Sequence, residues 1–70
     1  MKLKLKACRV NVDATAKEVA DYVGVTEDTV YNWECGKYIP SAFNMQKLLE
    51  FFANKGFSVT LDEIIFLRNK

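Results

Sequence analysis

The chain has 70 residues, of which 50% are hydrophobic and 27% are charged, a composition typical of one small globular domain. A domain of this size buries only ~60% of the surface that its unfolded chain exposes, which leaves little room for an enclosed pocket beside a core. Ten Lys and Arg residues against nine Asp and Glu residues give a formal net charge of +1, so any binding of nucleic acid must rest on the local arrangement of side chains.

The sequence lacks the residue patterns of metal and cysteine chemistry. Cys8 and Cys35 are far apart and there is no histidine, so neither the paired spacing of a zinc site nor a Cys–His nucleophile is available. No stretch has the apolar length of a signal peptide or of a membrane span. We therefore expect a soluble cytoplasmic protein with reduced thiols, which is not an enzyme, has no cofactor or metal and makes no contact with membranes.

The first two predicted elements are helices. Leu5, Cys8 and Val12 have helical spacing and indicate a helix over residues 3–11, although the alternation in KLKLK would equally suit a strand. The following segment TAKE has the capping-box form, in which the Thr hydroxyl and the Glu carboxylate each satisfy a free backbone amide. A second helix is therefore expected over residues 15–23.

Three further helices follow in the chain. Thr26 and Ser41 are single-residue caps that begin helices over 26–35 and 41–55, and the capping box TLDE begins a fifth helix over 60–67. A glycine follows each of the second, third and fourth helices, where a C-terminus favours a positive φ: Gly24, Gly36 and Gly56. The expected fold is all-α, a single small domain of about five helices.

The helix over 26–35 has a polar and aromatic outer face. At about 100° per residue, Thr26, Val30 and Trp33 share one side, and the other side carries Glu27, Asp28, Tyr31, Asn32 and Cys35. An Asn can pair with adenine in the major groove, a Tyr can reach a phosphate or a thymine methyl, and an acid can accept from a cytosine amino group. The candidate base-reading residues are therefore Glu27, Asp28, Tyr31 and Asn32.

Glu27 and Asp28 have a second explanation. Acids in the first turn complement the positive end of the helix dipole by ~0.3 to 1 kcal/mol each, which is sufficient to explain both residues. First-turn residues of a recognition helix also face base edges, so both explanations remain open. Carboxylates that point at bases are tolerable, but they weaken the non-specific attraction to a polyanion.

Several residue types stand at fixed offsets in the string TAKEVADYVGVTEDTVYNWECGKYIP, from Thr15 to Pro40. They are the Thr cap, the EVA step, the turn GVT, the inward Val, and the run WExGK that closes with Pro. With these features the string resembles the lambda-repressor-like, Cro-type helix-turn-helix family, also called XRE. The resemblance implies one helix-turn-helix DNA-binding domain over residues 1–70, with its third helix in the major groove.

Three departures from the family pattern bear on this expectation. Ala16 stands where the family commonly has a Gln that helps to hold phosphate or base, and Cys35 replaces a common Asn. Between Pro40 and Asp62 the chain is about one helical turn longer than the usual pattern, in the region where dimers of the family often meet. One expected contact is therefore missing, and the fourth helix or its loop differs.

The resemblance also implies roles for four basic residues. Lys6, Lys17 and Lys37 are placed near the phosphate backbone, and the N-terminal amides of the second helix face a phosphate. Arg9 has the spacing at which similar proteins pair an Arg with the Glu of the WE step, here Glu34. Such an ion pair would lock the first helix to the third.

The apolar residues exceed what a small core easily hides. Cys8 and Trp33 are expected to be buried, with Trp33 against the loop that contains Tyr38 and Pro40. The fourth helix has a broad apolar surface, mostly core, formed by Phe43, Met45, Leu48, Leu49 and Phe52. A further group is expected to contribute to a subunit interface: Phe51, Phe57, Phe66 and Leu67.

The leading hypothesis is a sequence-specific transcriptional regulator that binds double-stranded DNA, a small, phage-like, Cro-like repressor that forms a homodimer at least on its operator. It would bind no small-molecule ligand. The alternative is a protein-interaction module, antitoxin-like or an adaptor, that uses the same fold to bind a polypeptide. The near-neutral charge, Ala16 and the paired acids favour this alternative, and the polar outer face with Asn32 and Tyr31 disfavours it.

Overall fold

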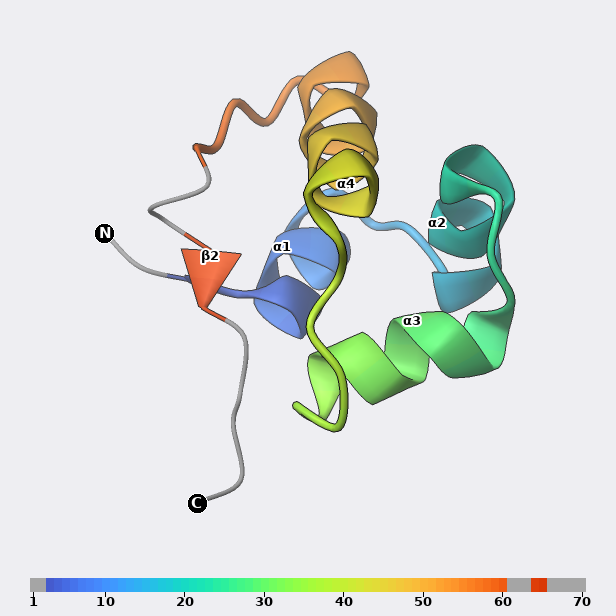
Figure 1. Ribbon diagram of the computed structural model, residues 1–70. Coiled ribbons are helices and arrows are strands. Elements are labelled where there is room, and N and C mark those ends of the chain that lie inside the picture. The colour runs from blue at the N-terminus through green and yellow to red at the C-terminus, as the bar shows by residue number, and fades with distance from the viewer. Residues whose placement is uncertain (1–2, 61–63, 66–70) are drawn as a thin grey trace.

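The computed structural model describes residues 3–60 and 64–65, with the backbone alone at Leu3 and Ile65 (Figure 1). Within them the chain forms the helices α1 (Leu5–Asn11), α2 (Ala16–Val23), α3 (Glu27–Glu34) and α4 (Ala42–Asn54). Two short strands, β1 (Leu3–Lys4) and β2 (Ile64–Ile65), pair in parallel, with Leu3 opposite Ile64. The predicted all-α fold class is confirmed, and the strands join the two ends of the described chain.

Three of the predicted caps begin helices as expected. At α2 the Thr15 hydroxyl accepts from the Glu18 amide at 3.1 Å, and the Glu18 carboxylate accepts from the Thr15 amide at 2.9 Å, which completes the capping box. At α3 and α4 the Thr26 and Ser41 hydroxyls each accept one amide of the first turn. Local side-chain chemistry therefore sets these helix starts.

Gly24 ends α2 and turns the chain toward α3. Its φ is +91°, a left-handed conformation that side chains disfavour, and its amide donates to the Ala20 carbonyl at 2.8 Å. A Cβ added at this position would meet nothing within 4 Å. The backbone angle, and not a lack of space, is therefore the reason that glycine is favoured here.

The core lies where the four helices meet. Cys8 of α1, Val19 of α2, Val30 of α3, and Leu48 and Phe52 of α4 are fully buried. α2 packs against both α3 and α4, so it holds the third helix to the rest of the core (Figure 1). The predictions that Cys8 and Trp33 are buried are both confirmed.

The predicted fifth helix over 60–67 is wrong at Ile64–Ile65, which form β2. Both residues are β-branched, a type that fits strands, and β1 offers them a hydrogen-bonding partner. The capping box at Thr60 was the signal for a helix, but a helix of eight residues is marginal without a packed face. At the other end of the chain, Leu3–Lys4 is a strand, so the alternative left open for KLKLK is confirmed there.

The predicted burial of the fourth helix is correct in part. Leu48 and Phe52 are buried as expected, but Phe43 is exposed, because it lies in the first turn of α4, away from the core. Phe51, which was expected at an interface, is buried and packs edge-on against Tyr22 of α2. Phe57 is partly buried against the core, and Phe66 and Leu67 lie outside the described residues.

Candidate nucleic-acid interface

α3 presents one face outward and buries the other. Val30 and Trp33 are buried and attach the helix to the core. Glu27, Asp28 and Tyr31 are exposed on the outer face. The structure therefore agrees with the face that the helical periodicity predicted, and it brings candidate base-reading residues onto one surface.

Asn32 lies at the margin of this outer face and is half-buried. Its backbone carbonyl accepts from the Lys37 amide at 2.9 Å, which ties the loop after α3 to the helix. Within the described part of the chain, the side-chain amide of Asn32 has no hydrogen-bond partner. Its donor and its acceptor are therefore both available to a ligand.

The three lysines predicted at phosphates have different surroundings. Lys6 of α1 is exposed and lines a depression together with Tyr31 and Asn32 of α3. Lys17 is exposed, and its ammonium lies 3.3 Å from the carboxylate of Asp21. Lys37 follows α3, with its ammonium 5.6 Å from the centre of the Tyr38 ring. The structure therefore brings Lys6 into one concave surface with predicted base-reading residues.

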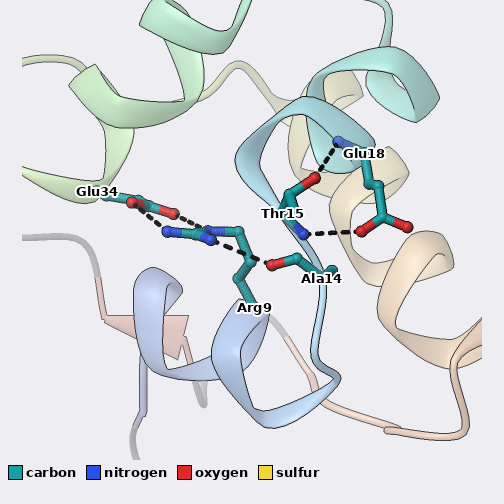
Figure 2. Close-up of polar contacts among 5 residues, drawn as sticks. All are labelled: Arg9, Ala14, Thr15, Glu18 and Glu34. Carbon is teal, nitrogen blue, oxygen red and sulfur yellow. Dashed lines mark hydrogen bonds and ion pairs between the residues drawn. The ribbon is translucent and has the colours of Figure 1, made fainter.

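An ion pair fixes α3 relative to α1. Arg9 Nε donates to Glu34 Oε2 at 2.6 Å, and Arg9 Nη2 donates to Glu34 Oε1 at 3.2 Å (Figure 2). Arg9 Nη1 donates to the carbonyl of Ala14 at 3.1 Å, so the same guanidinium also holds the segment before α2. The bonds to Glu34 raise the pKa of Arg9, and partial burial opposes that rise. The predicted Arg9–Glu34 pair is confirmed.

The start of α2 departs from the family pattern at Ala16. Ala16, which stands in place of the family's common Gln, is buried, so a long polar side chain would have to turn away from the core. The carboxylate of Glu18 lies beside it in the capping box, 3.9 Å from the ammonium of Lys55. The hydrogen bond from the Thr15 amide lowers the pKa of Glu18. Glu18 therefore forms an ion pair with Lys55 at this end of α2, whereas sequence reasoning treated Glu18 only as a cap.

Two features of the interface were missed from the sequence. Asp21 offsets the charge of Lys17, a contact that the spacing of four residues on one helix could have indicated. Lys6 and Asn32 line one depression although they are far apart in the chain. No local pattern signals that second juxtaposition, because the packing of α1 against α3 creates it.

The described residues contain neither a metal-binding cluster nor a membrane-spanning element. His, Cys, Asp and Glu side chains do not gather in threes in this part of the chain. None of the helices α1 to α4 combines the length and apolar character that crossing a bilayer requires.

Comparison with known families agrees with this geometry. A model of the helix-turn-helix family of the Cro/C1 type, also called XRE, matches residues 5–63. The chain therefore belongs to this family of DNA-binding regulators. No curated protein and no solved structure matches it significantly.

Proposed function

We propose that this chain is a sequence-specific transcriptional regulator of double-stranded DNA, a small Cro-like repressor that acts by occluding its site. The observation that carries the proposal is the outer face of α3, where Tyr31 is exposed and Asn32 has an unpaired side-chain amide among the described residues. A reading helix needs such a polar face above a buried one. α3 would lie in the major groove as one rigid unit with α1, held by Arg9 and Glu34.

We assign the proposed contacts by chemistry. Asn32 would pair with adenine through its side-chain amide, and Glu27 and Asp28 would accept from cytosine amino groups. The same two acids lie in the first turn of α3, where they also favour the helix dipole. Base reading and helix stabilisation are therefore compatible roles for these carboxylates.

Three lysines would contact phosphates: Lys6, Lys17 and Lys37. Asp21 accompanies Lys17 at 3.3 Å, so the net charge that Lys17 brings to the DNA is reduced. With at most three phosphates per subunit, and about 0.9 in the logarithmic salt slope for each, a dimer should have a slope no steeper than about −6. Binding should therefore be less sensitive to salt than that of a regulator with basic arms.

A two-fold dimer on DNA is part of the proposal. Two reading helices on successive turns of one DNA face stand ~34 Å apart. The longest dimension of the molecule is 33 Å, which is close to this spacing, so two copies that lie end to end on such a site would meet over a narrow contact. The exposed apolar residues nearest the end of α3 are Tyr38, Ile39 and Phe43, and we assign this surface, the loop patch, to the contact with the second copy.

The size and charge of the loop patch support assembly on DNA instead of in free solution. Tyr38 is 57% and Phe43 is 65% exposed, which for aromatic residues corresponds to on the order of 250 Å² together. A stable interface needs about 800 Å² per partner. Lys37 and Lys47 lie beside the two rings, so two copies related by a two-fold axis would bring like charges together, which nearby phosphates would offset.

The protein-interaction module remains the second candidate, and the exposed loop patch is the observation that favours it. A polypeptide partner could cover the same residues.

Selection of DNA sites from a random pool, followed by footprinting and mobility shifts, separates the two candidates. The proposed regulator should protect a roughly palindromic site with half-sites about 10 base pairs apart. Failure to enrich any sequence would favour the polypeptide partner.

A further inference from the structure

The depression between α1 and α3 brings together residues that no sequence motif connects. Lys6 of α1 lines it with Tyr31, Asn32 and Glu34 of α3 and with Cys35, the residue after the helix. Its volume is about 400 Å³, and a phosphate group occupies roughly the space of two or three water molecules at about 30 Å³ each. Space therefore does not prevent a phosphate and its sugar neighbours from entering.

The polar groups among the residues that line the depression favour an anion. Lys6 offers an ammonium with three donors, Tyr31 a hydroxyl and Asn32 an amide, whereas the thiol of Cys35 donates to the Asn32 carbonyl at 3.5 Å. Glu34 is the one acid in this lining, and both of its carboxylate oxygens accept from Arg9. Arg9 therefore compensates the charge of Glu34, and the ammonium of Lys6 is the remaining charge in this lining.

The place of the depression along α3 favours the DNA backbone over a base. The first turn of a reading helix faces base edges, whereas Tyr31 lies beyond the first turn of α3 and Cys35 follows the helix. The free carbonyls at the C-terminus of a helix carry a partial negative charge, which disfavours a bound anion. Here the Tyr31 carbonyl accepts from the Cys35 amide at 3.0 Å and the Asn32 carbonyl from the Lys37 amide, so both are already engaged.

We infer that this depression, the phosphate seat, binds one phosphodiester of the DNA backbone. Lys6 and the hydroxyl of Tyr31 would hold the phosphate, with the Asn32 side chain at its rim. The inference rests on the proposed DNA-binding function and names a contact within it. Tyr31 then positions the backbone instead of touching a thymine methyl. Because Lys6 and Tyr31 hold the same phosphate, they act as a pair, and sequence discrimination stays with Glu27, Asp28 and Asn32.

Cys35 supplies a direct probe of the seat. Its thiol is exposed, whereas Cys8 is fully buried, so iodoacetamide should modify Cys35 first. A duplex carrying the selected site, added at about ten times its Kd, should slow alkylation of Cys35 about tenfold. Inorganic phosphate at millimolar concentration should protect little, and Cys35→Ser should leave only the slow background of Cys8.

Variants of Lys6 and Tyr31 test whether both side chains contact the same phosphate. Lys6→Met should weaken binding equally on all DNA sequences and lower the logarithmic salt slope by about 0.9 per subunit. Tyr31→Phe should weaken binding about threefold to tenfold without changing base preference. The effect of Tyr31→Phe should shrink when Lys6 is already Met, because both side chains serve one phosphate. Lys4→Met removes a neighbouring exposed charge that does not line the depression, and it should change little.

The outcomes of these experiments distinguish failure of the phosphate seat from failure of the proposed function. If DNA binds but does not protect Cys35, or if Lys6→Met behaves like Lys4→Met, the seat is overturned while the proposed regulator stands. Equal protection by inorganic phosphate and by DNA would make the depression a site for free anions and would also overturn the seat. If no DNA complex forms in mobility shifts, the proposed function fails and the seat fails with it. Protection by DNA together with a coupled loss in the Lys6 and Tyr31 variants supports the inference.

Discussion

Arg9 and Glu34 lie 25 positions apart in the chain, yet their side chains form a two-pronged ion pair, with Arg9 Nε 2.6 Å from Glu34 Oε2. The two side chains are only 13% and 7% exposed, so both charges are held largely away from water. The third donor of Arg9 reaches the Ala14 carbonyl, which links α1, the segment before α2 and α3 (Figure 2). The pair therefore helps to fix the orientation of α3 relative to α1.

Glu34→Ala should destabilise the fold by on the order of 3 kcal/mol, because it leaves the Arg9 guanidinium in a mostly buried place without its partner. Urea unfolding followed by circular dichroism measures the change. Asp21→Ala is the matched control, since its partner Lys17 is exposed and such pairs contribute only about 0.2 to 1 kcal/mol. Equal losses in the two variants would contradict a structural role for the Arg9–Glu34 pair.

Because of the capping box at α2, we expect the folded protein to lose stability as the pH falls. The Thr15 amide lowers the pKa of Glu18 in the folded state, below the unfolded value of about 4.3. Its stabilising contribution is therefore present above that value and is lost as the pH falls through the folded pKa. Glu18→Gln keeps an oxygen acceptor for the Thr15 amide but removes the charge, so stability near neutral pH should fall slightly while the decline below about pH 5 becomes shallower. Parallel curves for the variant and the parent protein in pH-dependent urea unfolding would contradict this.

Asn32→Ala should relax the preference for one base in each half-site by ~1 to 3 kcal/mol, because its side-chain amide would no longer pair with that base. Competition binding on a panel of single-base variants of the selected site measures the change. Asn11→Ala, an exposed Asn at the end of α1, is the control and should leave the preference intact. A uniform loss on every sequence would instead make Asn32 a backbone contact.

Asp28→Asn and Glu27→Gln separate the two roles of the first-turn acids. Each should lower stability by about 0.3 to 1 kcal/mol, since the helix dipole loses a favourable charge. If the carboxylates also accept from cytosine amino groups, as we propose, the variants should lose discrimination at one position while their non-specific affinity rises. Thermal unfolding and binding to a random duplex measure the two effects. Unaltered base preference would leave only the stabilising role.

Phe43→Ser tests the loop patch as the contact between two copies on DNA. Phe43 is exposed and outside the core, so the folded state should keep its stability. The full palindromic site should be bound more weakly and less cooperatively, while affinity for a single half-site stays unchanged. Phe52→Ser, at a fully buried position, is the contrasting variant and should unfold the protein instead. A Phe43 variant that binds both sites like the parent protein would exclude the patch from the dimer.

The sequence by itself determined the features that depend on neighbours in the chain. The Thr15 and Glu18 side chains cap α2, and Gly24 ends it, because these effects act over three or four residues and need no distant partner. The outer and inner faces of α3 follow from helical periodicity in the same way. The Arg9–Glu34 pair was also predicted, but through resemblance to a family and not from local chemistry.

Tertiary structure alone decided the features that depend on packing between distant segments. Ile64 and Ile65 follow the sequence TLDE, which has the capping-box form, yet they form a strand that pairs with β1. Phe43 and Phe51 lie on one apolar helix, but only Phe51 meets the core, since the contact with α2 selects which side of α4 is covered. Lys6 shares a depression with Asn32 for the same reason: side chains so far apart in sequence meet only once the core has set the position of α1 against α3.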